Sequence, residues 1–125
     1  MSEKKSILKD KSFTFSIGII NLYKYLIEEK KEYILSKQLL RNGTAIGALI
    51  REAQNAESSK GFIHKLAIAQ KECDETIYWL ELLNETNYFT TLEFDSICSH
   101  ATELLKMIRS SIITVKKKQL ITHIS

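Results

Sequence analysis

Apolar residues recur along this chain at the three- and four-residue spacing of an amphipathic helix. In the segment from Leu35 to Ala53 they fall at Leu39, Ile46 and either Leu49 or Ile50. A second segment carries a heptad-like seam at these positions: Phe62, Leu66, Ala69, Cys73, Thr76, Leu80 and Leu83. Such a seam is typical of a helix that packs lengthwise in a bundle. The two segments are therefore predicted to form a helical hairpin, with a break at residues 58–61.

Two further helices are predicted on either side of the hairpin. The four helices are expected at about residues 12–30, 33–57, 59–84 and 91–118, with Ser58 or Ser59 capping the third and Thr90 or Thr91 capping the fourth. Residues 1–11 are expected to be loosely docked, and residues 119–125 to form a tail. Four helices with short connections favour an all-α, antiparallel, up-down-up-down bundle in a single domain, residues 1–125.

The first helix carries apolar residues on two sides rather than one. One stripe contains Phe13, Ile17, Ile20 and Ile27, and the other contains Phe15, Ile19, Leu22 and Leu26. A helix in a small monomer usually buries only one side, so this pattern favours a homo-oligomer. In the second helix, small residues at four-residue spacing predict close approach of a neighbouring helix: Gly43, Thr44, Gly47 and Ala48.

Four stretches of the hairpin together resemble a known family. They are Ser36-x-Gln38-Leu39-Leu40-Arg41-x-Gly43-Thr44-x-Ile46-Gly47-Ala48, Glu52-Ala53, Phe62-x-x-Lys65-Leu66, and Lys71-Glu72-x-x-Glu75-Thr76-x-Tyr78-Trp79-Leu80. The family is that of bacterial four-helix-bundle proteins whose founding members are encoded in intervening sequences of large-subunit ribosomal RNA genes. These proteins are loosely labelled ribosomal proteins. The chain is also similar to the accessory variability protein of diversity-generating retroelements.

The resemblance covers residues 36–83 and implies a pentameric, barrel-like ring. The chain departs from the family pattern at Asn42 and Ala45, where Ser is common, and at Gly61, where Asp is common before the Phe. The departure at Gly61 moves the expected helix cap back to Ser58 or Ser59. The ribosomal label reflects where the founding genes lie, and it is poor evidence of residence in a ribosome.

Composition narrows the class of protein further. The chain has 125 residues, no Pro and four Gly, which leaves little turn chemistry for strands and hairpins. Cys73 and Cys98 are expected to be buried free thiols. No signal peptide and no apolar run of about 20 residues is visible, so we expect a soluble, cytoplasmic protein without a membrane partner.

The formal net charge of +3 is unevenly distributed. No Asp or Glu follows Glu103, and lysines also gather near the N-terminus. The candidate nucleic-acid-binding residues are Lys4, Lys5, Lys9, Lys11, Lys106, Arg109, Lys116, Lys117 and Lys118. They would contact phosphates without sequence preference. The alternative is a solvated helix end whose cations complement the helix dipole.

Catalysis and metal binding find no support in the sequence. The chain has no Glu-x-x-His pair, no Cys-x-x-Cys and no Gly-x-Ser-x-Gly, and no cofactor is predicted. Glu72 and Glu75 could form an acid–base pair only inside an enclosing pocket. An ion network between the second and third helices is the favoured alternative, with these members: Arg41, Arg51, Lys65, Glu72 and Glu75.

Trp79 lies beside the seam of the third helix. It is expected either to pack on the first or fourth helix or to face a neighbouring subunit. Candidate subunit-interface residues are Phe15, Ile19, Tyr78 and Trp79.

The leading hypothesis is a non-catalytic, oligomeric accessory protein that binds RNA or DNA, or a ribonucleoprotein, through basic residues. The alternative is a protein–protein interaction module with no nucleic-acid role. Binding to nucleic acid should require the basic residues at the chain ends and weaken as the salt concentration rises. Binding to a protein through an apolar patch should do neither.

Overall fold

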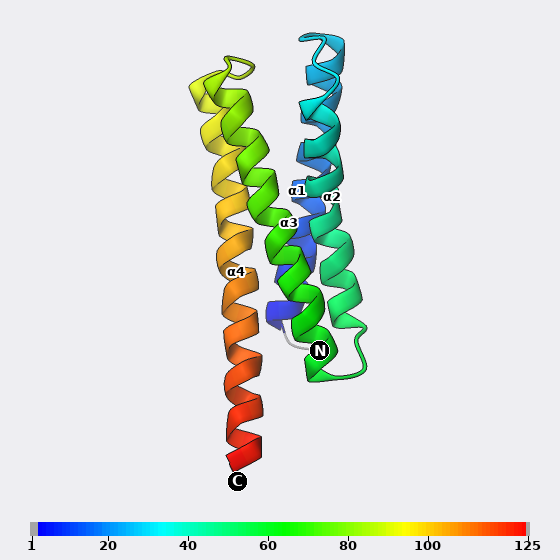
Figure 1. Ribbon diagram of the computed structural model, residues 1–125, viewed down its shortest axis with the longest axis vertical. Helices are drawn as coiled ribbons and strands as arrows, with labels where there is room; N and C mark the ends of the chain where they lie inside the picture. Colours follow the sequence, from blue (N-terminus) through cyan, green and yellow to red (C-terminus); the bar gives the residue numbers. More distant parts are fainter. Residues whose placement is uncertain (1–2, 125) are drawn as a thin grey trace.

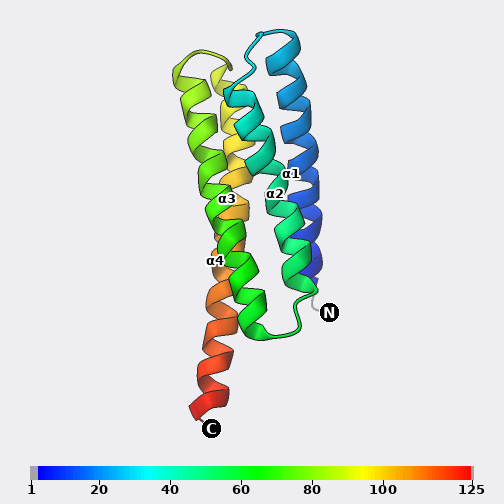
Figure 2. The ribbon, with the colours of Figure 1, turned by 45° about the vertical axis from the view of Figure 1, so that its right-hand side comes forward.

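A computed structural model of the chain describes residues 3–124, and the side chains of residues 7–122. Four α-helices follow one another: α1 (Glu3–Glu28), α2 (Leu35–Gln54), α3 (Ser59–Glu85) and α4 (Thr91–Ile124). Each helix runs antiparallel to the one before it and packs against it, and α1 also contacts α4 (Figures 1 and 2). The predicted all-α, up-down-up-down four-helix bundle is therefore confirmed.

The largest differences from the predicted bounds are at the start of α1 and the end of α4, and α2 is also shorter than predicted, Leu35–Gln54 rather than 33–57. α1 begins at Glu3 rather than near residue 12, because Leu8 and Ser12 are buried and hold its first turns against the bundle. α4 continues to Ile124, through the segment that was predicted to be a tail. In Figures 1 and 2 the last turns of α4 extend beyond the ends of the other helices.

Apolar side chains from all four helices fill the centre of the bundle. The largest that are almost wholly buried are Ile19, Leu26, Leu39, Ile46, Ile50, Leu66, Leu80, Leu83, Leu104 and Ile108. They lie on the stripes that the sequence pattern predicts for the four helices. Burial of a side chain of this size contributes about 1.5–3 kcal/mol, so this core supplies most of the driving force for folding.

Side chains at the helix ends satisfy backbone N–H groups. Ser58 caps α3 by accepting a hydrogen bond from the backbone N–H of Gly61 at 3.0 Å. Thr90 and Glu93 cap α4 reciprocally, since each side chain accepts a bond from the other residue's backbone N–H. These contacts confirm the predicted caps and identify Ser58 and Thr90 as the residues that provide them.

The cap of α2 was not predicted. Glu32, in the α1–α2 connection, accepts hydrogen bonds from the backbone N–H groups of Ile34 (3.1 Å), Leu35 (2.9 Å) and Ser36 (2.6 Å). The carboxylate is buried, and burial alone raises its pKa. The three backbone donors outweigh that effect and lower the pKa of Glu32 below its ordinary value. A single ionised carboxylate thus satisfies the first turn of α2.

The turn after α3 is closed without glycine. Asn87 takes a left-handed backbone conformation, with φ of 68°. The N–H of Tyr88 bonds to the carbonyl of Leu83, and the N–H of Asn87 bonds to that of Asn84. This is a Schellman motif, in which Asn replaces the usual Gly because its short polar side chain tolerates this conformation.

Candidate functional site: the basic end of the bundle

The antiparallel order of the helices brings both ends of the chain to the same end of the bundle. α1 begins there and α4 ends there, as Figures 1 and 2 show. An even number of antiparallel helices necessarily has this result. The lysine-rich segments, far apart in sequence, therefore lie toward the same end of the bundle, where the last turns of α4 extend past the start of α1 (Figures 1 and 2).

Lys116, Lys117 and Lys118 form the densest group of cations at this end. All three side chains are exposed on the last turns of α4. Within residues 7–122, none of them forms an ion pair with a carboxylate. Because no acidic residue follows Glu103 in the sequence, their charge is not compensated along the helix.

Two of the other candidate cations help to hold the bundle together. Lys11 of α1 forms an ion pair with Glu103 of α4, and this contact lowers the pKa of the Glu103 carboxyl. Arg109 of α4 lies 3.9 Å from Asp74 of α3. A cation engaged by a carboxylate in this way is less able to bind a phosphate.

Of the four remaining candidate cations, two have described side chains, and both are exposed. Lys9 and Lys106 are exposed on α1 and α4. Lys4 and Lys5 belong to the first turns of α1, but their side chains lie outside the described residues. Of the seven candidate cations with described side chains, Lys11 and Arg109 are thus engaged by carboxylates and the other five are not.

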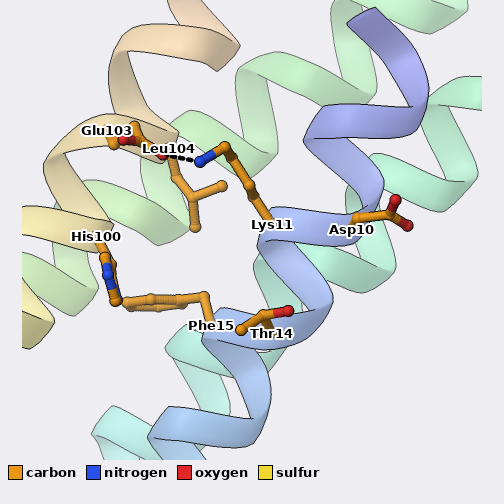
Figure 3. Close-up of a pocket in the computed structure, with 7 residues that line it drawn as sticks. All are labelled: Asp10, Lys11, Thr14, Phe15, His100, Glu103 and Leu104. Carbon is orange, nitrogen blue, oxygen red and sulfur yellow. Dashed lines mark hydrogen bonds and ion pairs between the residues drawn. The ribbon is translucent and has the colours of Figure 1, made fainter. Parts of the chain in front are cut away.

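A small cavity lies where α1 and α4 meet, with a volume of about 210 Å³. Phe15 and Leu104 form its floor, and Figure 3 shows Lys11 and Glu103 bridging the two helices above it. His100 lies beside the ring of Phe15, while Asp10 points away from the bridge (Figure 3). Pockets for small-molecule ligands usually have volumes of about 300–1,000 Å³, so this one suits no cofactor-sized molecule.

The predicted ion network between α2 and α3 is replaced by a network centred on Asn42. The Asn42 side chain is fully buried. Its amide NH2 donates to both Glu72 and Glu75, the latter at 2.8 Å. Its carbonyl oxygen accepts a bond from Trp79 Nε1 at 2.8 Å. One amide therefore joins three side chains of α3, and the two carboxylates act in packing α2 against α3.

A sequence signal for Asn42 exists. The residue lies three positions after Leu39 and four before Ile46, on the apolar seam of α2. A polar residue at a seam position must find hydrogen-bond partners when it is buried. The expectation of arginine partners came from charge alone, and charge does not reveal which side chain faces the seam.

The arginines and Lys65 have other partners. Arg41 donates to Gln38 on its own helix at 2.9 Å. The Arg51 guanidinium lies 5.5 Å from the centre of the Phe13 ring on α1. Lys65 pairs with Glu52 at 2.9 Å and so links α3 to α2. Only Lys65 makes an ion pair between these two helices, and its partner is not one of the expected carboxylates.

The small residues of α2 divide into two groups. Gly43 and Gly47 face α1, where a Cβ at Gly43 would lie 2.8 Å from Ile19 and one at Gly47 would lie 3.5 Å from Ser12. Thr44 donates to the carbonyl of Leu40 on its own helix, and Ala48 is exposed. Close approach of α1 and α2 therefore depends on Gly43, while Gly47 leaves room for a Cβ.

The candidate interface residues also divide. Phe15 and Ile19 are buried within this chain, so the structure removes them from any surface that a second copy could contact. Trp79 is half-buried, and its Nε1 donates to Asn42 of α2, a partner that neither expected placement included. Tyr78 is exposed beside it, with ring centres 5.2 Å apart. The exposed apolar stripe of α1 is instead the other one, Phe13, Ile17 and Ile20.

The thiols do not form a nucleophilic site. Both cysteines are free. Cys73 is buried, its thiol donates to the carbonyl of Ala101, and burial, reinforced by Asp74, raises its pKa to about 12. Cys98 is half-buried, and burial raises its pKa as well. A thiol with a raised pKa is a poor nucleophile at neutral pH. Among the described residues, no group of three His, Cys, Asp or Glu side chains is arranged to hold a metal ion.

Comparisons with known proteins identify the family of this chain and a solved structure with the same fold. Residues 4–110 match the profile of a family described as 23S rRNA-intervening sequence protein. A solved structure of a protein of unknown function from the S23 ribosomal protein family of Bacteroides thetaiotaomicron is 52% identical, with a TM-score of 0.86. The alignment covers 87% of this chain and 97% of that one. No curated protein matches the chain. The profile match over most of its length shows that this chain belongs to the 23S rRNA-intervening sequence protein family.

Proposed function

We propose that this protein is a non-catalytic accessory protein that binds nucleic acid through the basic end of its bundle. The observation that carries the proposal is the exposed group of Lys116, Lys117 and Lys118 at the end of the bundle where α1 begins. Uncompensated lysines on an exposed helix release counterions when they bind phosphates, and that release drives sequence-independent binding.

The family match supports RNA as the first probe, because the family is described by reference to 23S rRNA. The matched profile ends at residue 110, before the three lysines. In this proposal the shared bundle is a scaffold, and the last turns of α4 add a phosphate-binding element to it. We place the protein in the cytoplasm, where RNA is found and free thiols stay reduced.

Self-association is a second part of the proposal. Phe13, Ile17 and Ile20 form an exposed apolar stripe on α1, with exposed fractions of 54%, 46% and 38%. A second copy of the chain that covers this stripe would remove the side chains from water. A ring of copies, which the family resemblance implies, would repeat the basic end and strengthen the positive electrostatic potential that attracts phosphate.

The test is a fluorescence-anisotropy titration of labelled RNA and DNA with nuclease-treated protein, repeated over a series of salt concentrations. We expect log Kd to depend linearly on log salt. The triple variant Lys116→Ala/Lys117→Ala/Lys118→Ala should bind roughly tenfold more weakly at low salt. Its salt slope should be smaller by about 2, as expected for three lost contacts to single-stranded phosphates.

A matched control variant removes three lysines elsewhere: Lys30, Lys37 and Lys71, each replaced by Ala. These side chains are exposed and lie away from the basic end, so the net charge falls equally. If both triple variants lose the same affinity, binding depends on net charge alone and the proposed site is wrong. If the wild type binds neither nucleic acid at low salt, the function itself is wrong, and a protein-interaction module becomes the better hypothesis.

A further inference from the structure

The outer side of α4 carries aliphatic side chains that the bundle does not cover. Ile113 is 53% exposed, Leu120 60% and Ile121 66%. Ile113 and Leu120 are seven positions apart, which places them on one face of the helix, two turns from each other. Ile108 and Ile112 are buried and point to the core. The helix therefore has a second apolar face outside the core, and near its end Leu120 borders a hollow that Ser59 at the start of α3 also lines.

The charges that α4 itself contributes to this face are all positive, while Glu57 of the α2–α3 connection borders it beside Lys118. Lys117 lies between Ile113 and Leu120 at helical spacing, and Lys116 and Lys118 flank it on the two sides. No Asp or Glu occurs from residue 104 to the end of the sequence. The long aliphatic stems of lysine allow the charged groups to reach past an apolar surface to a polar one.

The occupant of such a face must be both apolar and negatively charged. Nucleic-acid phosphates would account for the lysines but leave the aliphatic side chains in water. A specific protein partner is usually matched by charges of both signs, which set register, and α4 contributes only positive charge here. A second copy would place lysines against lysines. The surface of an anionic bilayer satisfies both requirements without any register, because acyl chains lie directly beneath the phosphates.

The shape of the molecule suits a flat partner. α4 forms one long edge of the bundle in Figure 1 and extends beyond the other helices in both views. Its 34 residues span about 51 Å at the usual rise of an α-helix. The whole edge can therefore lie along a surface, with no helix crossing it. Among the described residues, no helix is long and apolar enough to cross a membrane.

We propose that the outer face of α4 from Ile113 to Ile121 binds the surface of an anionic lipid bilayer. Its aliphatic side chains enter the headgroup region and its lysines contact lipid phosphates. This inference goes beyond nucleic-acid binding, although both use the same three lysines. The aliphatic side chains distinguish the two activities, because a lipid surface removes them from water and nucleic-acid phosphates do not.

The test is sedimentation of the full-length protein with vesicles of phosphatidylglycerol and phosphatidylcholine, compared with vesicles of phosphatidylcholine alone. We expect binding to the anionic vesicles only. The variant Ile113→Gln/Leu120→Gln keeps every charge and should partition roughly tenfold more weakly. The matched control is Ile34→Gln/Leu92→Gln, which alters side chains that are 77% and 81% exposed. They lie at the starts of α2 and α4, at the other end of α4 from the tested face. This control should bind as the wild type does.

Three results would overturn the proposal. The first is no binding of the wild type to anionic vesicles at low salt. The second is equal binding by Ile113→Gln/Leu120→Gln, which would show attraction by charge alone. The third is a wild type that ignores vesicles while this variant loses RNA affinity or changes its oligomeric mass, which would assign the aliphatic side chains to RNA or to a second copy. Loss of RNA binding in the lysine variant alone bears only on the proposed function.

Discussion

Asn42 is the side chain on which the contact between α2 and α3 depends most. It bonds to Glu72, Glu75 and Trp79 from a fully buried position. We predict that Asn42→Ala lowers the free energy of unfolding by about 1–3 kcal/mol, because three polar groups lose a buried partner at once. Urea denaturation followed by circular dichroism measures this change.

The control for Asn42 is Trp79→Phe, which removes a single donor and keeps an aromatic ring. Its cost should be smaller, about 0.5–1.5 kcal/mol, as for one neutral hydrogen bond. If Asn42→Ala costs no more than Trp79→Phe, the carboxylates do not depend on the amide, and the network does not stabilise the helix pair.

Glu32 makes stability depend on pH. Its pKa is lowered in the folded protein, so its contribution is present above the pKa of the unfolded chain, near 4.5, and is lost as pH falls through the lowered pKa. We predict that Glu32→Gln costs about 1 kcal/mol at pH 7, as for a lost helix cap, because an uncharged amide accepts these bonds less strongly.

The measurement for Glu32 is the difference in unfolding free energy between wild type and Glu32→Gln from pH 7 to pH 3. The difference should shrink with acid, because the wild-type carboxyl then becomes neutral too. Glu28→Gln, at an exposed position in the last turn of α1, provides the control. A constant difference across this range would show that the charge of Glu32 plays no part.

The packing of α1 against α2 involves two glycines with different surroundings. A Cβ at Gly43 would lie 2.8 Å and 2.9 Å from the branch carbons of Ile19, which is fully buried and cannot move aside. A Cβ at Gly47 would meet Ser12 and Ser16 at 3.5 Å, an ordinary contact distance. The same substitution should therefore have opposite effects at the two positions.

We predict that Gly43→Ala destabilises the protein by about 1–3 kcal/mol through overpacking. Gly47→Ala should be neutral or stabilise it by up to about 1 kcal/mol, because alanine favours the helix and meets no obstacle. Thermal and urea denaturation of both variants test the pair. Equal destabilisation by both would show that α1 and α2 approach as closely at Gly47 as at Gly43.

The helices themselves were predictable from the sequence where apolar spacing is regular. α3, expected at residues 59–84, is observed at Ser59–Glu85. The start of α1 was not, because polar residues, mostly lysine, dominate residues 3–11 and mask the few apolar ones there. The end of α4 was not, because the described side chains after Lys118 are exposed and no core stripe continues into this segment. Leu8 reveals its role only when α1 is packed, where it is 4% exposed.

At the scale of the whole molecule, the exposed stripe of α1 is the surface that we propose a second copy covers. We predict that Ile17→Asp/Ile20→Asp lowers the oligomeric mass, to the 14.4 kDa of one chain if this stripe is the interface. A carboxylate buried between subunits without a partner is strongly unfavourable. Sedimentation velocity measures the mass, and Ile34→Asp/Leu92→Asp serves as the control. An unchanged mass in the first variant would exclude the stripe as an interface.

The sequence by itself determined that the chain is helical and that four helices form a bundle. Apolar spacing decides both, because each helix must bury one stripe and four stripes close a single core. The cap residues of α3 and α4 were also predictable, because each cap side chain bonds to a backbone N–H only three residues further along the chain. The sequence also shows lysines that outnumber acidic residues at both ends of the chain. It does not show that both chain ends lie at the same end of the bundle.

Only the tertiary structure decided which of the two apolar stripes of α1 is buried and which partner each polar side chain finds. Both stripes have helical spacing, and the choice depends on which side α2 and α4 occupy. Glu72 and Glu75 pair with Asn42, thirty and more residues away, rather than with an arginine. Contacts between distant segments follow from packing geometry, which residue type and spacing along one helix do not contain.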